Sequence, residues 1–343
     1  MSYVLGIDHG NTKTAAVVAN DDGVICGYAC VKNHDLNIPC TDAVAYTISV
    51  VREAYGRALL NAGLQINDVD MVTGGLTGAD WPEEYNVLKD ALIRASGITD
   101  VMVYNDCIPA FFGHIGRPYG AVICSGSGLN VGIVGPDGET EALGWYIDAD
   151  SSGASALGRR AIRAVIASDV GVAEPTALKT HILRAFNYRS VEELLRGYIA
   201  GTLPDVRRLA PCVFDAAEEG DGAAAGIITD CAVWAARYAI TLLRRHNMLE
   251  RDPDIVLSGS VLKNKFGLMR EKIAELIYEK CPQARVEDAV YEPVVGAAIM
   301  ALQRKAGSTL GEKIKANIRA SCDKHGLLRE IGRATNIYGY PHM

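Results

Sequence analysis

The sequence predicts a duplicated α/β protein with two lobes and a cleft between them. Three observations support this prediction. Apolar, strand-like runs alternate with helical segments in the first part of the chain, one strand–bend–strand pattern occurs twice, and the chain is 343 residues long. Single hydrophobic cores stop growing beyond about 250–300 residues. Strands separated by helices imply a largely parallel sheet with helices packed against it.

The expected elements alternate at first and then change in character. In order, they are strands at 3–8, 12–19 and 24–30, a helix at 42–62, a strand at 69–73, a helix at 83–95 and a strand at 101–104. Residues 153 to about 246 are rich in Ala, Arg and Glu and are expected to form successive helices. A strand at 255–257, a helix ending at 279, a short strand near 285–289 and a helix at 293–305 follow.

The second lobe is expected to begin where the opening pattern returns. Residues 120–143 read GAVICSGSGLNVGIVGPDGETEAL, which repeats the strand, Gly-rich bend, strand, Asp-Gly turn and strand of the opening. Gly10 to Gly23 spans 13 positions and Gly126 to Gly138 spans 12. A lone bend of this kind is usually only a turn of a hairpin. Two in matching positions favour anion sites formed by successive backbone N–H groups, able to hold a polyphosphate from two sides.

This organisation divides the chain into three parts. We expect an N-terminal lobe at 1–117 and a C-terminal lobe at 118–305 that contains the helical insertion at about 153–246. Residues 306–343 are expected to form a helical C-terminal extension packed on the body.

Composition and charge exclude several classes of protein. The formal charge of −7 gives no basic surface for nucleic acid. We see no apolar run of the roughly 18 residues that span a bilayer, and no leader pattern at the N-terminus. Nine cysteines without C-x-x-C spacing, the closest being Cys26 and Cys30, are expected to be free thiols. These features predict a cytoplasmic protein without membrane or nucleic-acid partners.

Short motifs along the chain resemble those of a known superfamily. Residues 6–14, GIDHGNTKT, are similar to the first phosphate motif of the actin, hexokinase and heat-shock ATPase superfamily. Further motifs follow in the order of a narrower group: Asn33-His34, GLTGAD at 75–80, NDC at 105–107, CSGSG at 124–128, Gly144-Trp145, LSGSV at 257–261 and EPVVGAA at 292–298. That group is the BadF/BadG/BcrA/BcrD ATPase family, which includes N-acetylglucosamine kinase. The resemblance covers residues 3 to about 302 and implies a ribonuclease H-like (actin-like ATPase) fold.

The resemblance implies binding of ATP with Mg²⁺. The residues that would bind the nucleotide are Gly10, Asn11, Thr12, Lys13, Gly126, Ser127 and Gly128 for the phosphates, and Gly259, Ser260 and Gly296 for adenosine. Asp8, at a strand end, is suited to orient Mg²⁺ through water, because Mg²⁺ dehydrates reluctantly and bridges phosphates. The alternative for Asp8 is a turn-capping role, and Lys13 would equally suit a solvent-facing strand position.

The resemblance also implies a sugar site. Asp106 is the candidate base that accepts the proton of the attacking hydroxyl, although an N-cap role for residues 107–113 is the alternative. Asn33 resembles the sugar-binding Asn of the family, or is an ordinary loop Asn. Trp145 would be either a core aromatic or part of the pocket wall. The remaining substrate-binding candidates are His34, Thr77, Gly78, Gly144 and Ser151.

Two departures from the family pattern bear on activity and specificity. The usual DGGGT is DHGNT here, so that His9 and Asn11 replace glycines and an imidazole is expected near the phosphates or Mg²⁺. Relatives carry an Asp-Glu pair near the sugar hydroxyls where this chain has Ser151 and Ser152. Asp148 or Asp150 could take over that role after a small loop shift. We therefore predict that N-acetylglucosamine is a poor substrate and that a different or larger sugar derivative is preferred.

Three classes of function remain open from the sequence. The first is an ATP-dependent kinase of a sugar or amino-sugar hydroxyl, which the full order of motifs favours. The second is a non-kinase ATPase such as the dehydratase activators of the family, whose cluster-binding cysteines have no matching pair here. The third is a catalytically silent nucleotide or sugar sensor, which stays open because of Ser151 and Ser152. A DNA-binding repressor is not expected, because the first strand begins at residue 3. Relatives are often homodimers, and we expect the same here.

Overall fold

The computed structural model describes residues 2–36 and 42–329, which form two compact units. The first contains residues 2–122, Gly132–Ala142 and Glu287–Arg329, and the second contains Ile123–Val131 and Leu143–Val286. The lobe boundaries expected from the sequence stay a prediction.

The first five-stranded sheet has the order β3-β2-β1-β4-β5. Its strands are β1 (Tyr3–His9), β2 (Lys13–Asn20), β3 (Ile25–Lys32), β4 (Val69–Leu76) and β5 (Val101–Tyr104). β1, β2 and β3 pair antiparallel, whereas β4 pairs parallel with both β1 and β5. The expected parallel sheet is therefore mixed, with an antiparallel half formed by the opening hairpins.

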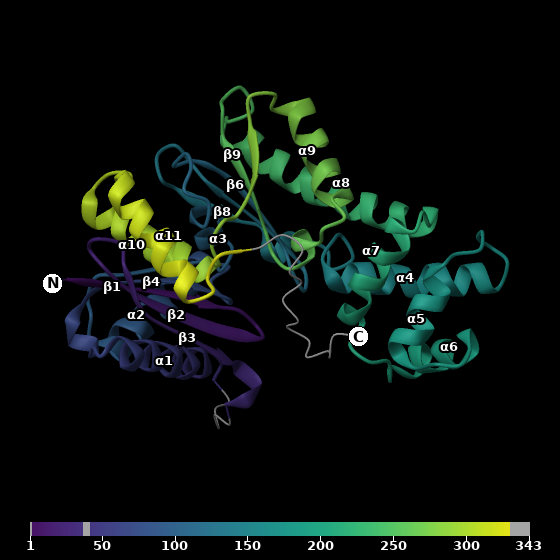
Figure 1. The fold of residues 1–343 in the computed structure, drawn as a ribbon, viewed down its shortest axis with the longest axis horizontal. Helices are drawn as coiled ribbons and strands as arrows, with labels where there is room; N and C mark the ends of the chain where they lie inside the picture. The colour runs from purple at the N-terminus through teal and green to yellow at the C-terminus, as the bar shows by residue number, and fades with distance from the viewer. Residues whose placement is uncertain (1, 37–41, 330–343) are drawn as a thin grey trace. The chain divides into compact units, whose positions relative to one another are not determined.

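Helices cover both faces of this sheet (Figure 1). Leu5 and Ile7 face a core shared with α1 (Ala43–Ala62) and α2 (Pro82–Ser96). Val4 faces the opposite core, shared with α10 (Pro293–Ala306) and α11 (Glu312–Lys324). Successive side chains of a strand point to opposite faces, so a strand buried on both sides has a nearly continuous apolar sequence.

The second sheet repeats the topology of the first. Its order is β10-β9-β6-β7-β8, which in reverse matches β3-β2-β1-β4-β5 position by position. The strands are β6 (Gly120–Ser125), β7 (Leu129–Val134), β8 (Thr140–Ala142), β9 (Asp254–Ser258) and β10 (Arg285–Asp288). Gly23 and Gly138, which close the second turn of each copy, have φ of 81° and 85°. This left-handed backbone strongly favours glycine, and the predicted duplication is confirmed.

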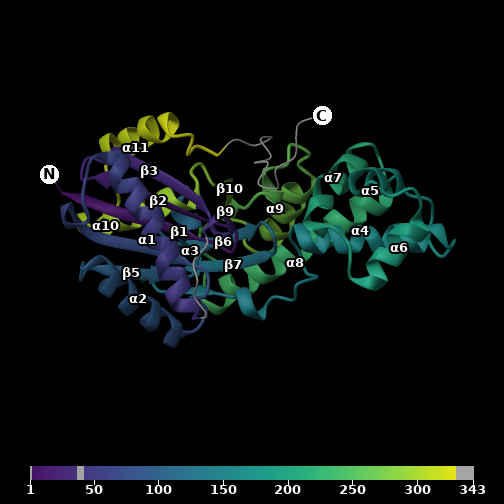
Figure 2. The same cartoon turned by 90° about the horizontal axis from the view of Figure 1, so that it is seen from below.

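Along the chain, a run of helices separates β8 from β9 (Figures 1 and 2). They are α4 (Ala154–Asp169), α5 (Leu178–Phe186), α6 (Val191–Ala200), α7 (Ala210–Glu218) and α8 (Gly222–Arg245), and α9 (Leu268–Lys280) follows β9. Short helical segments are η1 (Asn33–Asp35), η2 (Ile66–Asp68), α3 (Ile108–Phe112), η3 (Gly144–Tyr146), η4 (Val206–Leu209) and η5 (Val261–Lys263). Ser190 caps α6 and Asp221 caps α8 with side-chain oxygens, as is usual at helix starts.

One described helix, α8, is long and apolar enough to cross a membrane by length and composition alone. The sequence analysis missed this stretch because charges interrupt it. Half of the window is buried inside the protein, and α8 packs against α7 and α9. Because core helices of soluble proteins pass the same test, this is weak evidence for a membrane span.

The cysteines match the sequence expectation as far as they are described. Eight of them have free thiols, and Cys40 lies outside the described residues.

Candidate active site

The first Gly-containing motif is a hairpin turn between β1 and β2. The Gly10 N–H donates to the Lys13 carbonyl at 3.0 Å, and Asn11 and Thr12 at the tip are exposed. Asn11 has no positive φ, so replacing the family glycine here needs no left-handed backbone. A Cβ added at Gly10 would find its nearest atom 3.7 Å away. The turn is thus both a plain hairpin and an open place where an anion can approach backbone N–H groups.

His9 is buried beneath this turn. Its Nδ1 lies 2.7 Å from Thr14 Oγ1, and its Nε2 lies 3.4 Å from Thr47 Oγ1. The Thr14 hydroxyl donates its proton to Asn33 Oδ1, so Nδ1 carries the proton that Thr14 accepts, and Nε2 accepts from Thr47. Burial lowers the pKa of His9 to about 4 and keeps the ring neutral. The imidazole therefore belongs to a buried hydrogen-bonded chain beneath the turn, and its expected nearness to the phosphates or Mg²⁺ stays a prediction.

Asn33 holds the turn from the other side. Its Oδ1 accepts from Thr14 at 2.9 Å, its Nδ2 donates to the Gly10 carbonyl at 2.8 Å, and its backbone N–H donates to the Thr12 carbonyl at 3.0 Å. The residue is only 4% exposed. These bonds use one amide proton and one lone-pair direction of the side chain, and they give Asn33 a structural task at the phosphate turn. Its predicted contact with sugar stays a prediction, as does that of the exposed His34.

Asp8 lies in a group of charges at the end of β1. Burial raises the pKa of Asp8 to about 7; Lys13 opposes this shift, while Asp106 and Glu292 add to it. Lys13 Nζ lies 4.0 Å from Glu292 Oε2, and its side chain is 39% exposed. Burial would lower the pKa of Lys13, but Glu292 and Asp8 outweigh it and raise the pKa. Two carboxylates, Asp8 and Glu292, thus act on the Lys13 ammonium group, and Asp106 acts on Asp8. A cation would stabilise this arrangement.

This charge distribution fits Mg²⁺ carried by a nucleotide better than a metal held by protein alone. Among residues 2–36 and 42–329, no three His, Cys, Asp or Glu side chains form a metal-binding cluster. Mg²⁺ keeps several waters and is commonly bound through one or two carboxylates and the substrate phosphates. Asp8 is suited to that water-mediated role.

Asp106 follows β5 and lies next to Thr77. The Thr77 hydroxyl donates to Asp106 Oδ2 at 2.9 Å, and the Thr77 N–H donates to the His9 carbonyl at 2.8 Å. The N-cap of α3 is Cys107, without a side-chain capping bond. Asn105 makes the local turn instead, because its Oδ1 accepts from the Cys107 N–H at 3.1 Å. The capping alternative for Asp106 is therefore wrong.

The second Gly-rich bend is fixed to the start of α4. The Ala154 and Ser155 N–H groups donate to the carbonyls of Gly126 and Ser127 at 2.8 and 3.0 Å. A Cβ at Gly153 would lie 2.5 Å from Gly128, so the loop and helix approach closely. At Gly126 and Gly128 an added Cβ would meet nothing within 4 Å. The bend is rigidly backed, and space remains beside its two glycines.

Arg207 contributes a cation to this bend that the sequence analysis missed. Its Nη1 donates to Ser127 Oγ at 3.2 Å, across 80 residues of chain. Asp205 holds the same guanidinium at 2.6 Å. No spacing rule links η4 to the bend, so only the fold reveals this pair.

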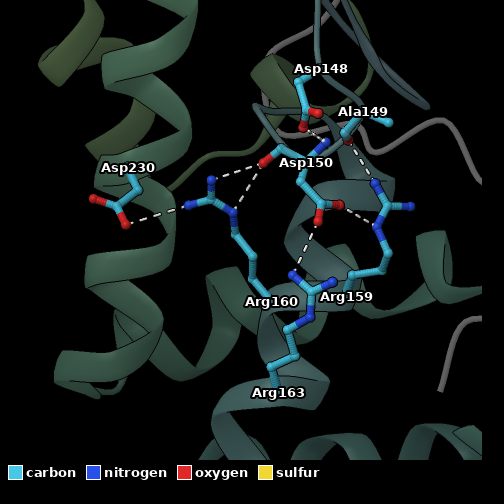
Figure 3. A network of polar contacts seen from close by, with 7 residues as sticks. All are labelled: Asp148, Ala149, Asp150, Arg159, Arg160, Arg163 and Asp230. Atoms are coloured by element: carbon cyan, nitrogen blue, oxygen red, sulfur yellow. Dashed lines mark hydrogen bonds and ion pairs between the residues drawn. The ribbon is translucent and has the colours of Figure 1, made fainter. Parts of the chain in front are cut away.

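The segment leading into α4 shows that one of the two Asp residues offered as replacements for the carboxylate pair is already held by arginines (Figure 3). Asp150 pairs with Arg159 and Arg163, and its carbonyl accepts from Arg160 at 2.8 and 3.1 Å. Asp148 accepts from the Asp150 N–H at 2.7 Å. Asp150 is thus committed to the arginines of α4.

Ser151 and Ser152 follow directly and are buried, at 4% and 1% exposure. The carboxylate of the preceding Asp150 is occupied by its pairs with Arg159 and Arg163. The predicted substrate contact of Ser151 stays a prediction.

The other predicted site residues fall into two groups. Trp145, beside Gly144 in η3, is 71% exposed, so the core-aromatic alternative is wrong. Gly78 has a φ of 88° in the loop after Thr77. Close packing requires glycine at two further positions. An added Cβ would lie 2.1 Å from Ser125 at Gly259 and 1.9 Å from Pro109 at Gly296. The adenosine roles of Gly259, Ser260 and Gly296 stay predictions.

The model of the BadF/BadG/BcrA/BcrD ATPase family matches residues 5–301 of this chain. The chain belongs to this family. Membership in an ATPase family implies ATP binding, and it agrees with the motifs read from the sequence.

Distant relatives of this family member are amino-sugar kinases. The chain is 23% identical over 305 residues to an N-acetylmuramic acid/N-acetylglucosamine kinase of Clostridium acetobutylicum, covering 88% of this chain and 98% of the relative. It is 24% identical over 324 residues to an N-acetyl-D-glucosamine kinase of Dictyostelium discoideum, with the same coverage. It is 26% identical over 266 residues to a glucosamine kinase of Vibrio cholerae, covering 76% of this chain and 85% of the relative.

Solved structures show the same actin-like ATPase fold. A candidate N-acetylglucosamine kinase of Chromobacterium violaceum superposes with a TM-score of 0.65 at 18% identity, covering 88% of this chain and 99% of that one. A ROK family glucokinase of Streptomyces griseus superposes with a TM-score of 0.56 at 20% identity, covering 87% and 98%. At these identities the likeness establishes the fold, and the predicted fold class is confirmed.

Proposed function

We propose that this ATPase-family member is an ATP- and Mg²⁺-dependent kinase that phosphorylates a hydroxyl group of a sugar or amino sugar. The proposal rests mainly on how the Asp106 carboxylate is oriented. Its carboxylate is oriented by the Thr77 hydroxyl, while Asn105 makes the local turn. A carboxylate held in this way is suited to accept a proton from an acceptor hydroxyl. The amino-sugar kinases among its distant relatives support the substrate class.

The residues have separate tasks in this reaction. Asp106 accepts the hydroxyl proton while the sugar oxygen forms its bond to the γ-phosphorus and the bond to the ADP oxygen breaks. The first turn, with Lys13, and the second bend, with Arg207, each offer donors to phosphate oxygens. Mg²⁺, when bound with the nucleotide, neutralises phosphate charge. Asp8 would hold its water shell.

We further propose that the acceptor is not plain N-acetylglucosamine. Ser151 and Ser152 replace a carboxylate pair, and Asp150 is committed to Arg159 and Arg163. A hydrogen bond to a charged group contributes about 1.5–3 kcal/mol, so one unreplaced bond weakens binding roughly ten- to a hundredfold. Because the two serines are uncharged and shorter than carboxylate side chains, the site can accept a substrate that carries a carboxylate or a bulkier substituent. N-acetylmuramic acid, named in the description of one relative, has that chemistry.

A turnover screen tests the proposal. ADP release with Mg·ATP is measured alone and with glucosamine, N-acetylglucosamine, N-acetylmannosamine, N-acetylmuramic acid and simple hexoses. We expect sugar-dependent turnover that is greatest for a derivative other than N-acetylglucosamine. A kcat/KM for N-acetylglucosamine above roughly 10⁴ M⁻¹s⁻¹, ordinary for an enzyme on its own substrate, would refute the specificity. ATP hydrolysis that no sugar stimulates would favour a non-kinase ATPase, and binding without turnover would favour a sensor.

A further inference from the structure

The chain continues past the family match, and its next helix is anchored on the β2–β3 hairpin. In α11, Ser321 Oγ accepts from the Ile25 N–H at 2.9 Å, and Asn317 Nδ2 donates to the Asp22 carbonyl at 2.8 Å. Ile318 is buried in the core that this face of the sheet shares with α10. Figure 2 shows α11 in yellow beside β3. Residues 306–329, the described part of the extension, thus belong to the first unit, whereas 330–343 lie outside the described residues.

After α11 the chain turns back at Gly326 and runs beside the residues that lead into α10. The Glu292 N–H donates to the Leu327 carbonyl at 3.0 Å, and Tyr291 and Leu328 form an antiparallel bridge. The Arg329 N–H then donates to the Val290 carbonyl at 2.8 Å. These consecutive connections fix the backbone of Arg329 next to the residue pair that precedes Glu292.

This position brings a second cation to the charged group at the end of β1. Glu292 is the residue whose carboxylate lies 4.0 Å from Lys13 Nζ. The positive charge of Arg329 tends to lower the pKa of Lys13, opposite to the effect of Glu292 and Asp8. The backbone bonds place Arg329 beside the residues that lead to Glu292, and its charge is close enough to Lys13 for the two to interact. An Arg fork matches two phosphate oxygens at once, which Lys cannot do.

We propose that Arg329, supplied by the extension beyond the family match, is a second cationic ligand for the phosphates of the nucleotide at the Gly10–Lys13 turn. This inference rests on the proposed nucleotide binding. It assigns the extension a task in ligand binding in addition to its packing. The extension thereby becomes a determinant of nucleotide affinity.

Calorimetry of the full-length protein with Mg·ATP and Mg·ADP tests the assignment. Arg329→Gln should weaken binding of Mg·ATP about ten- to a hundredfold, the range for a lost hydrogen bond to a charged group. Arg329→Lys should restore part of the affinity, because charge returns without the fork. Arg319→Gln removes the same charge from an exposed position of α11 and should leave affinity unchanged. Circular dichroism and a melting curve check that each variant is folded.

The outcomes separate this inference from the proposed function. Wild-type protein that binds no nucleotide contradicts the proposed function, and the inference with it. Wild-type protein that binds Mg·ATP while Arg329→Gln and Arg329→Lys bind equally well overturns the inference alone. A lowered melting temperature of Arg329→Gln with unchanged affinity would also overturn it, because it shows a purely structural role.

Discussion

Thr77 joins the end of β1 to the candidate base: its N–H donates to the His9 carbonyl, and its hydroxyl donates to Asp106 Oδ2 at 2.9 Å. The charge of Asp106 helps to raise the pKa of Asp8, the residue before His9. The candidate Mg²⁺ residue and the candidate base are therefore positioned by one short chain of bonds. Changes along this chain should affect turnover more than stability.

Asp106→Asn tests the base directly. Asn keeps the size of the side chain and can still accept from Thr77, but it cannot take a proton from the acceptor. We expect kcat to fall by about 10²–10⁴, the range for loss of a general base, with little change in nucleotide affinity. Asp90→Asn, the same chemical change at an exposed position of α2, is the control. Wild-type turnover in Asp106→Asn would remove the catalytic assignment.

Thr77→Val tests how far orientation of that carboxylate matters. Val has a similar shape but donates no hydrogen bond, so Asp106 should populate other rotamers. A net hydrogen bond contributes about 1 kcal/mol, which predicts a fall in kcat of roughly fivefold. Thr77→Ser keeps the hydroxyl and should retain most activity. Equal kcat values for the Val and Ser variants would show that this bond has no role in turnover.

His9→Ala should destabilise the protein. The buried ring bonds to Thr14 and Thr47, and its removal leaves a cavity and takes one hydrogen bond from each of the two hydroxyl groups. Two lost hydrogen bonds and the cavity predict a loss of about 2–4 kcal/mol in the free energy of unfolding. Urea unfolding measures this loss, and exposed His34→Ala is the control. A loss below about 0.5 kcal/mol would show that the buried chain contributes little.

The sequence was informative where local chemistry decides the structure. The two copies of the sheet were visible because turn glycines such as Gly23 and Gly138 and apolar strands leave regular local patterns. The orientation of His9 was also within reach, since neighbours on a strand point to opposite faces and Asp8 and His9 cannot both face the phosphates. The burial of His9 follows from this alternation, which the sequence analysis did not apply to it.

Other features depend on how distant segments fold together. Arg207 reaches Ser127 across 80 residues, and Arg329 reaches the residues before α10 only because α11 packs on the first sheet. Asp150 was offered as a sugar ligand because its partners on α4 cannot be identified from spacing.

The Asp150 pairs predict a dependence of stability on pH. Burial alone would raise the pKa of Asp150, but hydrogen bonds from Arg159 and Arg163 outweigh it and lower the pKa. Its folded pKa thus lies below the unfolded value of about 3.9. The carboxylate stabilises the fold above that value and loses this contribution as the pH falls through the folded pKa. Solvent screening limits the contribution to roughly 1 kcal/mol.

Urea unfolding at several pH values measures this contribution. Asp150→Asn should be less stable than wild type at pH 5–7, and the difference should shrink below about pH 4. Asp230 lies 3.4 Å from Arg160, but its side chain is 70% exposed. Asp230→Asn should therefore change stability little at any pH. A difference for Asp150→Asn that is independent of pH would contradict the ion-pair explanation.

Arg207→Gln tests whether the second bend receives a phosphate. The guanidinium already donates to Ser127 Oγ beside two glycines with open space, so a phosphate there would gain a charged donor. Loss of that donor should raise the KM for ATP about tenfold or more and leave the KM for the sugar nearly unchanged. Arg208→Gln is the matched control, because Arg208 lies over the Phe186 ring at 5.9 Å. If both variants raise the KM for ATP equally, the effect comes from η4 as a whole; if neither does, Arg207 only supports the loop.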